Sequence, residues 1–506
     1  MAEVKAATAK AQALSQNLVA ADTDGGIFYS GYEMVPCRGY LPRDADGRWI
    51  EGANPTRLLD GTTYGGFEIP VDAGFEAVEG DVDPYRCVVP FEDYPHSFAP
   101  EHGTLLTANQ DPGGLESDGD LSNDLWYIGG PWDDGYRAEA IDRRLGELNG
   151  AATLADMAAI QGYHGSALGR RHVGDLLEAI DAARSVQSPA PDSSEARLLA
   201  LYEDHQERVD EVYERLEGWA ERGYEAASGV ETFYHPSVDA AELDDAVATM
   251  IFNVWMGDLA RDVLDDEGLP SVWRGGGTAG RLRVLHRMFR DRGPGTEGSA
   301  GWNPATEESI FFDDRSTAGL TEESDEVALG ALIKALDFLE SEPTESAEGG
   351  FGTAEMDAWI WGYRHQAEFK SLVGAYIDDP LIGSIFAPFG IDTDDLPLAD
   401  LQPGDPRHAL EWFPRPADNR CIDAGNNGLS GRSFRHGSGP VMRMAFALGP
   451  EDIEGINVIP GGQSGILESE HYDDQLALWL ANDTLPLPIT VDEVVDAAVT
   501  RVTFHP

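Results

Sequence analysis

The feature that most constrains this chain is a long stretch of helical periodicity in its middle, within residues 151–380. Two segments there, MAAIQGYHGSALGRRHVGDLLEAIDAA and ARLLALYEDHQERVDEVYERLEGWAERG, carry apolar residues three and four positions apart. This spacing places apolar side chains on one face of a helix. Residues 1–150 mix strand-like runs with Gly- and Asp-rich turns, and residues 381–506 alternate Pro/Gly loops with short strand-like runs. This order predicts an α+β fold.

Both ends of the chain contain further elements that the pattern predicts. Near the start, YRAEAIDRRLGELNG is predicted as a helix that Gly150 ends. Near the end, the predicted strands are GPVMRMAFAL, GINVIPGGQSG and AVTRVTFHP. A length of 506 residues indicates more than one compact unit, and we find no internal repeat.

The charge of the chain limits its partners and its working conditions. Asp and Glu number 91 and Lys and Arg number 35, which gives a net charge of −56. The acidic residues are spread along the chain, so we interpret them as the hydrated surface of a halophilic protein. An ordinary acidic protein, or one that binds a basic partner, stays open as an alternative. The same charge disfavours nucleic acid, because phosphate binding needs a basic surface.

The cysteines and the apolar runs exclude several classes of protein. Cys37, Cys87 and Cys421 are odd in number and lack C-x-x-C spacing, so neither a disulfide framework nor a zinc site is predicted. We favour three buried or half-buried thiols, with a single Cys37–Cys87 bridge as the open alternative. No run is long and apolar enough for a membrane span, and the N-terminal residues lack the apolar core of a signal peptide. We therefore expect a soluble protein with no membrane partner, in a compartment that stays open.

Several motifs, taken in order, resemble the penicillin acylase (penicillin amidase) family of N-terminal-nucleophile hydrolases. The most specific is IPGGQSGILESEHYDDQLALWLANDTLPLPIT, which looks like the C-terminal signature of the family, with SGPVMRMAFAL as the strand before it. TANQDP, DDGYRAEAID, VVPFEDYPHSFAPEHG and NLVAADTDGGIFYSGYEMVP resemble elements of the catalytic subunit. The chain thus resembles the C-terminal part of that subunit.

The resemblance implies a fold and a reaction. The expected fold is an incomplete αββα sandwich of the N-terminal-nucleophile hydrolases with a large helical portion. Residues 1–150 would form part of the sandwich core, 151–380 the mainly helical region, and 381–506 the strands that complete the sandwich. The implied reaction is hydrolysis of a small-molecule N-acyl amide to a carboxylic acid and an amine by an N-terminal Ser, whose α-amine is the base. The chemistry needs no cofactor.

The resemblance also assigns roles to three residues. Asn109, in TANQDP, would hold the oxyanion of the tetrahedral intermediate through its side-chain amide. Arg137 would orient that asparagine and the nucleophile, and Asp124 would bind a structural calcium. Each residue type also has a simpler interpretation, since Asn caps turns, Arg at a helix start is solvated, and most aspartates of an acidic chain face water.

Other candidates for catalysis are set aside. The GGQSG block with His471, Tyr472 and Gln475 is structural in the family, and Gly461 and Gly462 are expected to permit a turn. His365, in WIWGYRH, is expected to be a packed or hydrogen-bonded residue. Ser299 lies in the one G-S-x-x-W string, but this string follows Asn109, whereas the family nucleophile precedes it.

That chain order leads to a specific expectation about the nucleophile. We expect the Ser on a separate N-terminal acylase half or subunit, so that this chain alone is inactive. The chain would then be an amidohydrolase component. The alternative is a catalytically inactive remnant that acts as a non-enzymatic acidic binding or scaffold protein.

Overall fold

The structure is a computed structural model that divides the chain into two compact units. Unit 1 comprises 1–153, 446–455 and 488–506, and unit 2 comprises 154–445 and 456–487. The structure describes the whole chain apart from residues 12–15, 116–117, 119, 122, 268–276, 297–300, 345–348, 371–383, 386–388, 430–431, 451, 499–501 and 504–506.

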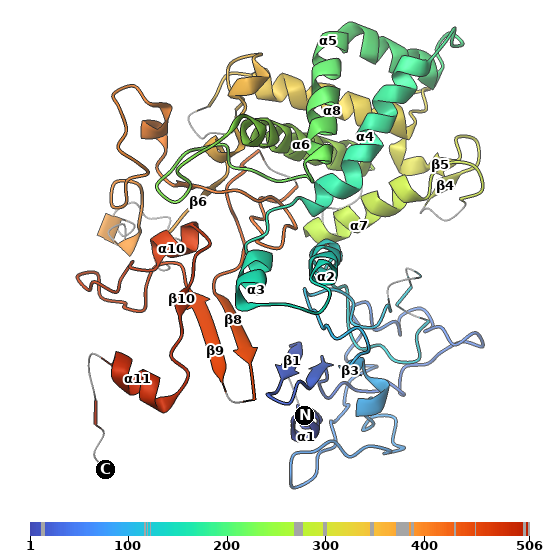
Figure 1. Cartoon of the computed structure of the whole chain (residues 1–506). Coiled ribbons are helices and arrows are strands. Elements are labelled where there is room, and N and C mark those ends of the chain that lie inside the picture. Colours follow the sequence, from blue (N-terminus) through green and yellow to red (C-terminus); the bar gives the residue numbers. More distant parts are fainter. Residues whose placement is uncertain are drawn as a thin grey trace. The chain divides into compact units, whose positions relative to one another are not determined.

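Unit 2 is built around long helices (Figure 1). They are α3 (Leu154–Gln161), α4 (Ala167–Ser185), α5 (Ser194–Glu221), α6 (Ala240–Leu264), α7 (Gly277–Arg290) and α8 (Ser324–Glu340). Side chains cap three of them at the N-terminus: the oxygens of Ser166, Ser193 and Asp239 accept backbone N–H groups of the first turns of α4, α5 and α6. Such caps satisfy donors that a helix leaves free.

The core of unit 2 is the helix α6. Almost every side chain from Asp245 to Ala260 is buried, so this helix is covered all round. Helices α5 and α8 pack against it. The indole N–H of Trp255 donates to the Ala328 carbonyl of α8 at 3.0 Å, and Trp219 of α5 packs on Phe252 at 5.4 Å between ring centroids. The predicted helical periodicity is thus confirmed, although the segment at 157–183 divides into α3 and α4.

Short strands and helical turns make up the rest of unit 2, and two of the strands continue into unit 1. A three-stranded antiparallel sheet in the order β10-β9-β8 pairs Leu485 with Asn457. Two of the predicted C-terminal strands are therefore confirmed, and the third lies mostly outside the described residues. The bounds are β8 (Arg443–Leu448), β9 (Ile453–Val458), β10 (Leu485–Pro486), β4 (Trp302–Asn303), β5 (Glu308–Ser309), β6 (Gln366–Ala367), β7 (Phe413–Pro414), α10 (Leu476–Leu480), η3 (Ile310–Phe312), η4 (Met356–Ala358), η5 (Trp361–Tyr363) and η8 (Pro406–Ala409).

Unit 1 consists mainly of turns around a small sheet. The antiparallel strands lie in the order β1-β2-β3, and Phe28 of β2 is fully buried in a cluster with Tyr32, Met34, Val89 and Phe91. The elements are α1 (Ala2–Thr8), β1 (Leu18–Ala21), β2 (Ile27–Ser30), η1 (Phe91–Asp93), β3 (His96–Phe98), α2 (Tyr136–Glu147) and α11 (Val491–Ala497). The predicted helix at 136–150 is confirmed as α2.

Aspartate side chains organise the turns of unit 1. In the segment 42–50, Asp44 Oδ1 accepts the backbone N–H groups of residues 46 and 48 at 2.9 and 3.0 Å. In the segment 70–78, Asp72 Oδ1 accepts those of residues 74 and 76 at 2.7 and 3.0 Å. Both segments form a small hairpin and begin with Pro-x-Asp-Ala. The two hairpins thus share one construction, in which an aspartate side chain accepts two backbone N–H groups of the turn.

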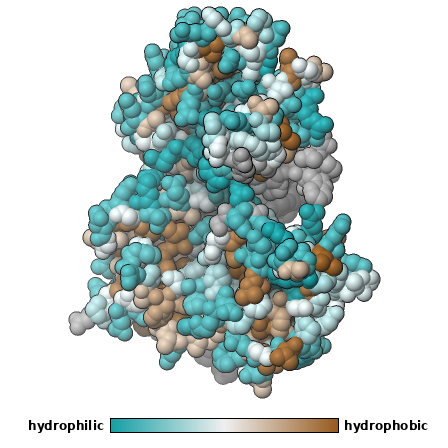
Figure 2. Space-filling model, turned by 90° about the vertical axis from the view of Figure 1, so that its right-hand side faces the viewer, coloured by the Kyte–Doolittle hydropathy of each residue, from teal (hydrophilic) through white to brown (hydrophobic). Residues whose placement is uncertain are grey.

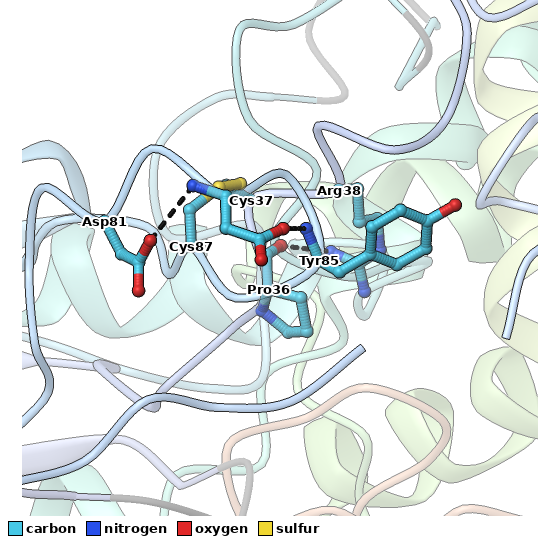
Figure 3. Close-up of a disulfide and its surroundings, with 7 residues drawn as sticks. Pro36, Cys37, Arg38, Asp81, Tyr85 and Cys87 are labelled. Atoms are coloured by element: carbon cyan, nitrogen blue, oxygen red, sulfur yellow. Dashed lines mark hydrogen bonds between the residues drawn. A yellow bond between two sulfur atoms is a disulfide. The ribbon is translucent and has the colours of Figure 1, made fainter. Parts of the chain in front are cut away.

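A disulfide between Cys37 and Cys87 closes the segment that contains both hairpins (Figure 3). The two Cα atoms are 5.5 Å apart, and the Cys37 N–H donates to the Cys87 carbonyl at 2.9 Å. The favoured interpretation of three free thiols is thus wrong for this pair. The two cysteines are 50 positions apart, and spacing alone does not show that the backbone pairs them. Cys421 is a buried free thiol, as expected.

Hydrophilic and hydrophobic residues are distributed unevenly over the viewed face. Figure 2 shows hydrophilic residues over most of the upper part of the viewed face, whereas hydrophobic residues gather in patches in its lower part. Among the helices that the structure describes, none is long and apolar enough to cross a membrane.

Candidate active site

Two of the three predicted site residues lie together in unit 1. Asn109 is in the loop between β3 and α2, and Arg137 is the second residue of α2. Gly135 precedes the helix with a φ of +92°, a left-handed conformation that suits glycine. This turn directs the chain into α2 and positions the arginine beside the loop of Asn109.

Asn109 has an unusual backbone conformation. Its φ is +65°, which non-glycine residues seldom adopt, although asparagine tolerates it better than most. The neighbouring peptide groups are held: the carbonyl of Asn109 accepts the N–H of Asp133 at 2.8 Å, and the N–H of Ala108 donates to the side chain of Gln110 at 2.6 Å. Uncommon backbone conformations that the surroundings stabilise are frequent at functional sites.

Arg137 determines which way the Asn109 amide points. Its Nη2 donates to Asn109 Oδ1 at 2.7 Å, to the Ala108 carbonyl at 2.9 Å and to Asp133 Oδ2 at 2.7 Å. A guanidinium group has only donors, so the atom that faces it must be the amide oxygen. The amide NH₂ of Asn109 therefore points away from the arginine, on an exposed residue. This arrangement presents a neutral hydrogen-bond donor to solvent.

Asp124 lies apart from this contact. Its backbone carbonyl accepts both Nη groups of Arg43 at 3.1 Å. Burial raises the pKa of its carboxyl, and the nearby charges of Asp118, Asp111 and Asp120 raise it further. Within the part of the chain that the structure describes, no group of three or more acidic, His or Cys side chains could hold a metal ion. The arrangement gives no coordination shell, and calcium binding by Asp124 stays a prediction.

Unit 2 contains a buried ionic network of its own. Asp423 accepts Arg415 Nη2 at 2.8 Å and Arg443 Nη2 at 2.7 Å, and His164 Nε2 lies 3.1 Å from Asp423 Oδ2. Both arginine side chains and the aspartate are at most 2% exposed. Burial disfavours the charged carboxylate, but the hydrogen bond from His164 and the two guanidinium charges lower the pKa of Asp423 well below its ordinary value.

Comparison with known proteins decides the family. A sequence model of the family described as penicillin amidase matches residues 1–496. The chain belongs to the penicillin amidase family. A search among solved structures finds a thermostable penicillin G acylase from Alcaligenes faecalis, in an orthorhombic form, with a TM-score of 0.51. The match has 16% sequence identity and covers 100% of this chain and 70% of that chain. A search among curated proteins finds no match.

The structure and the family agree on a mixed α/β protein with small antiparallel sheets, which confirms the predicted resemblance. Membership of the penicillin amidase family supports an amidohydrolase function for the chain, that is, a hydrolase acting on amide bonds.

The C-terminal signature of the penicillin amidase family has the structural role that was predicted for it. Gly461 has a φ of +93°, and a Cβ on Gly462 would lie 2.1 Å from the His471 carbonyl oxygen, so only glycine fits at both positions. The buried Gln475 accepts the N–H of Ile459 through its side chain at 3.1 Å. The block thus fixes a tight turn between β9 and α10.

His365 is packed, as predicted for the W-G-x-x-H element. It is fully buried, stacks on Trp361 with 4.6 Å between ring centroids, and has Nδ1 2.7 Å from the Phe434 carbonyl. Burial lowers its pKa well below the ordinary value. Ser299, the serine of the G-S-x-x-W string, lies outside the described residues.

The sequence reasoning missed two sets of residues. Asp133 contacts both predicted catalytic residues, and the spacing of four positions between Asp133 and Arg137 could have drawn attention to this pair. The network around Asp423 has no comparable signal, because Arg415, Asp423 and Arg443 join a histidine more than two hundred residues away. Only the tertiary structure shows that these residues meet.

Proposed function

We propose that this chain is the component of a penicillin-acylase-type amidohydrolase that carries the oxyanion asparagine. The observation that supports it most is the hydrogen bond from Arg137 to the Asn109 amide oxygen, which leaves the amide NH₂ facing outward. In hydrolysis of an acyl amide, negative charge develops on the carbonyl oxygen, and a fixed donor at that place lowers the barrier.

The chemistry of Asn109 and Arg137 suits this role. The amide donates a hydrogen bond without carrying a charge that would retain the carboxylate product. The guanidinium behind it polarises the amide, because hydrogen bonds in a chain strengthen one another. The Arg137 side chain is 25% exposed, so water screens it only in part. Arg137 would thus both orient Asn109 and increase the donor strength of its NH₂.

The nucleophile in this proposal is a Ser outside these 506 residues. In the resemblance to the family, the nucleophile precedes the asparagine in a G-S-x-x-W context. None of the serines before Asn109 (Ser15, Ser30, Ser97) follows a glycine. A partner chain or segment that carries the Ser would therefore complete the enzyme, and its α-amine would act as the base. The substrate class is a small-molecule N-acyl amide.

The test is Asn109→Ala in the enzyme assembled with a Ser-bearing half from a related acylase. The turnover number should fall by about 10²–10³, the usual effect of removing one oxyanion donor. KM should change much less, because the contact forms fully only as charge develops. Hydrolysis of a chromogenic acyl anilide in molar salt measures both.

Asn149→Ala is the matched control. Asn149 is also an exposed asparagine of unit 1 with a positive φ, +49°, and it lies just after α2. Its replacement should leave turnover unchanged. Near-normal turnover of Asn109→Ala would contradict the oxyanion role and favour a non-enzymatic acidic binding protein.

A further inference from the structure

We infer that Asp133 is a positioning residue that fixes the conformation of Asn109 from two sides. This inference rests on the proposed oxyanion role and adds a residue to it. The backbone N–H of Asp133 donates to the Asn109 carbonyl at 2.8 Å, and its carboxylate accepts Arg137 Nη2 at 2.7 Å. One residue therefore contacts both members of the predicted pair.

The backbone contact concerns the left-handed conformation of Asn109. The peptide groups on either side of its Cα atom are both restrained: the Ala108 carbonyl accepts Arg137 Nη2, and the Asn109 carbonyl accepts the Asp133 N–H. A parallel bridge between Gln110 and Asp133 continues this pairing. A conformation that is unfavourable for a non-glycine residue persists when its surroundings determine it in this way.

The side-chain contact concerns the arginine. Arg137 reaches the loop through a single nitrogen, Nη2, which is shared by Asn109 Oδ1, the Ala108 carbonyl and Asp133 Oδ2. The carboxylate holds the guanidinium at this nitrogen and balances its charge. The Asp133 side chain is 15% exposed and that of Arg137 25%, so the pair is shielded more than an ordinary surface ion pair.

Together these contacts give Asp133 a defined effect on the reaction. Without its carboxylate the guanidinium can leave the Asn109 amide oxygen, and the amide can then rotate. The NH₂ group would no longer be held at one place, and a small displacement of a group that stabilises the transition state costs up to about 10²-fold in rate. Asp133 would act through Asn109 and would not touch the substrate.

The decisive variant is Asp133→Asn in the assembled enzyme, because it keeps the backbone N–H and the side-chain size. We expect the turnover number to fall by roughly 10–10²-fold while KM stays within about twofold. The double variant Asn109→Ala/Asp133→Asn should be no slower than Asn109→Ala, since residues that act through one group are not additive. A general loss of folding would instead add to the loss from Asn109→Ala.

A measurement without substrate separates the two proposals. In the full chain labelled with ¹⁵N-asparagine, the side-chain NH₂ resonance of Asn109, assigned by its loss in Asn109→Ala, should shift or broaden in Asp133→Asn. The control Asp142→Asn, at an exposed position of helix α2, should leave this resonance unchanged.

The outcomes are distinct. If Asn109→Ala slows the enzyme but Asp133→Asn changes neither turnover nor the resonance, the positioning role is wrong and the oxyanion role stands. If Asn109→Ala has no effect on turnover, the proposed function fails. A shifted resonance in Asp133→Asn would in that case still establish that Asp133 fixes the conformation of the Asn109 side chain.

Discussion

The two units use the same abundant carboxylates in different ways. In unit 1, aspartates such as Asp44 and Asp72 accept backbone N–H groups in turns that have no extended sheet ladder. In unit 2, Asp423 is buried between two arginines, within a unit whose long helices bury apolar side chains. Unit 2 also contains such turns, at Asp314, Asp392 and Asp405, but its large core additionally encloses the carboxylate of Asp423 as part of a buried ion pair.

The units also differ in how much apolar surface they cover. Leu58 and Val82 of unit 1 are 101% and 96% exposed, whereas helix α6 of unit 2 is buried along most of its length. Burial of apolar surface is the main favourable term in folding. We therefore expect unit 2 to be the more stable unit and unit 1, which carries Asn109, to open first. Binding and catalytic loops are commonly drawn from the less stable parts of a protein.

Removal of salt should have the largest effect and should reach unit 1 first. The net charge of −56 repels itself at low ionic strength. At 1 M salt the Debye length is only about 3 Å and the repulsion is screened. On transfer from molar to millimolar KCl we expect loss of cooperative folding, and hydrogen exchange by mass spectrometry should show unit 1 exchanging before the helices of unit 2. Unchanged protection from molar to millimolar KCl would contradict the halophilic interpretation, and an equal loss of protection in both units would contradict the comparison.

Removal of the carboxylate of Asp423 should destabilise unit 2 by about 3–5 kcal/mol, because it removes the negative charge that neutralises two buried guanidinium groups. Asp423→Asn tests this with little change in size, and urea unfolding followed by the helical circular dichroism signal measures it. The control is Asp337→Asn, which breaks the pair of Arg208 and the exposed Asp337 and should cost at most about 1 kcal/mol. Equal losses for the two variants would mean that burial of the network contributes nothing.

Loss of the disulfide should destabilise unit 1 by roughly 2–4 kcal/mol, because the cross-link restricts the unfolded chain. A reductant, or the double variant Cys37→Ser/Cys87→Ser, should speed proteolysis within residues 38–86 and leave the helical signal of unit 2 intact. The double variant should not respond to reductant, which serves as the control. Thiol titration of the denatured, unreduced protein should find Cys421 as the one free thiol, and three free thiols would contradict the pairing.

The sequence predicted the helices and the pair of site residues better than the contacts between segments that are far apart in the chain. The apolar spacing predicted α5, and the strand pattern predicted β8 and β9. Helix α11 was missed, because its residues were not distinguished from the loops around them. The predicted pair Asn109 and Arg137 is in contact, while the catalytic roles of both stay predictions.

What the sequence determined by itself is therefore local or motif-based: the helical periodicity of unit 2, the acidic composition and the penicillin amidase signature. The tertiary structure alone decided the Cys37–Cys87 pairing, the left-handed backbone of Asn109 and the position of Asp133 between Asn109 and Arg137. The physical reason is the separation along the chain of the residues that determine each feature. Periodicity reports which face of one element is buried, whereas a disulfide or a shared guanidinium depends on where the fold brings distant segments together, and no local pattern encodes that distance.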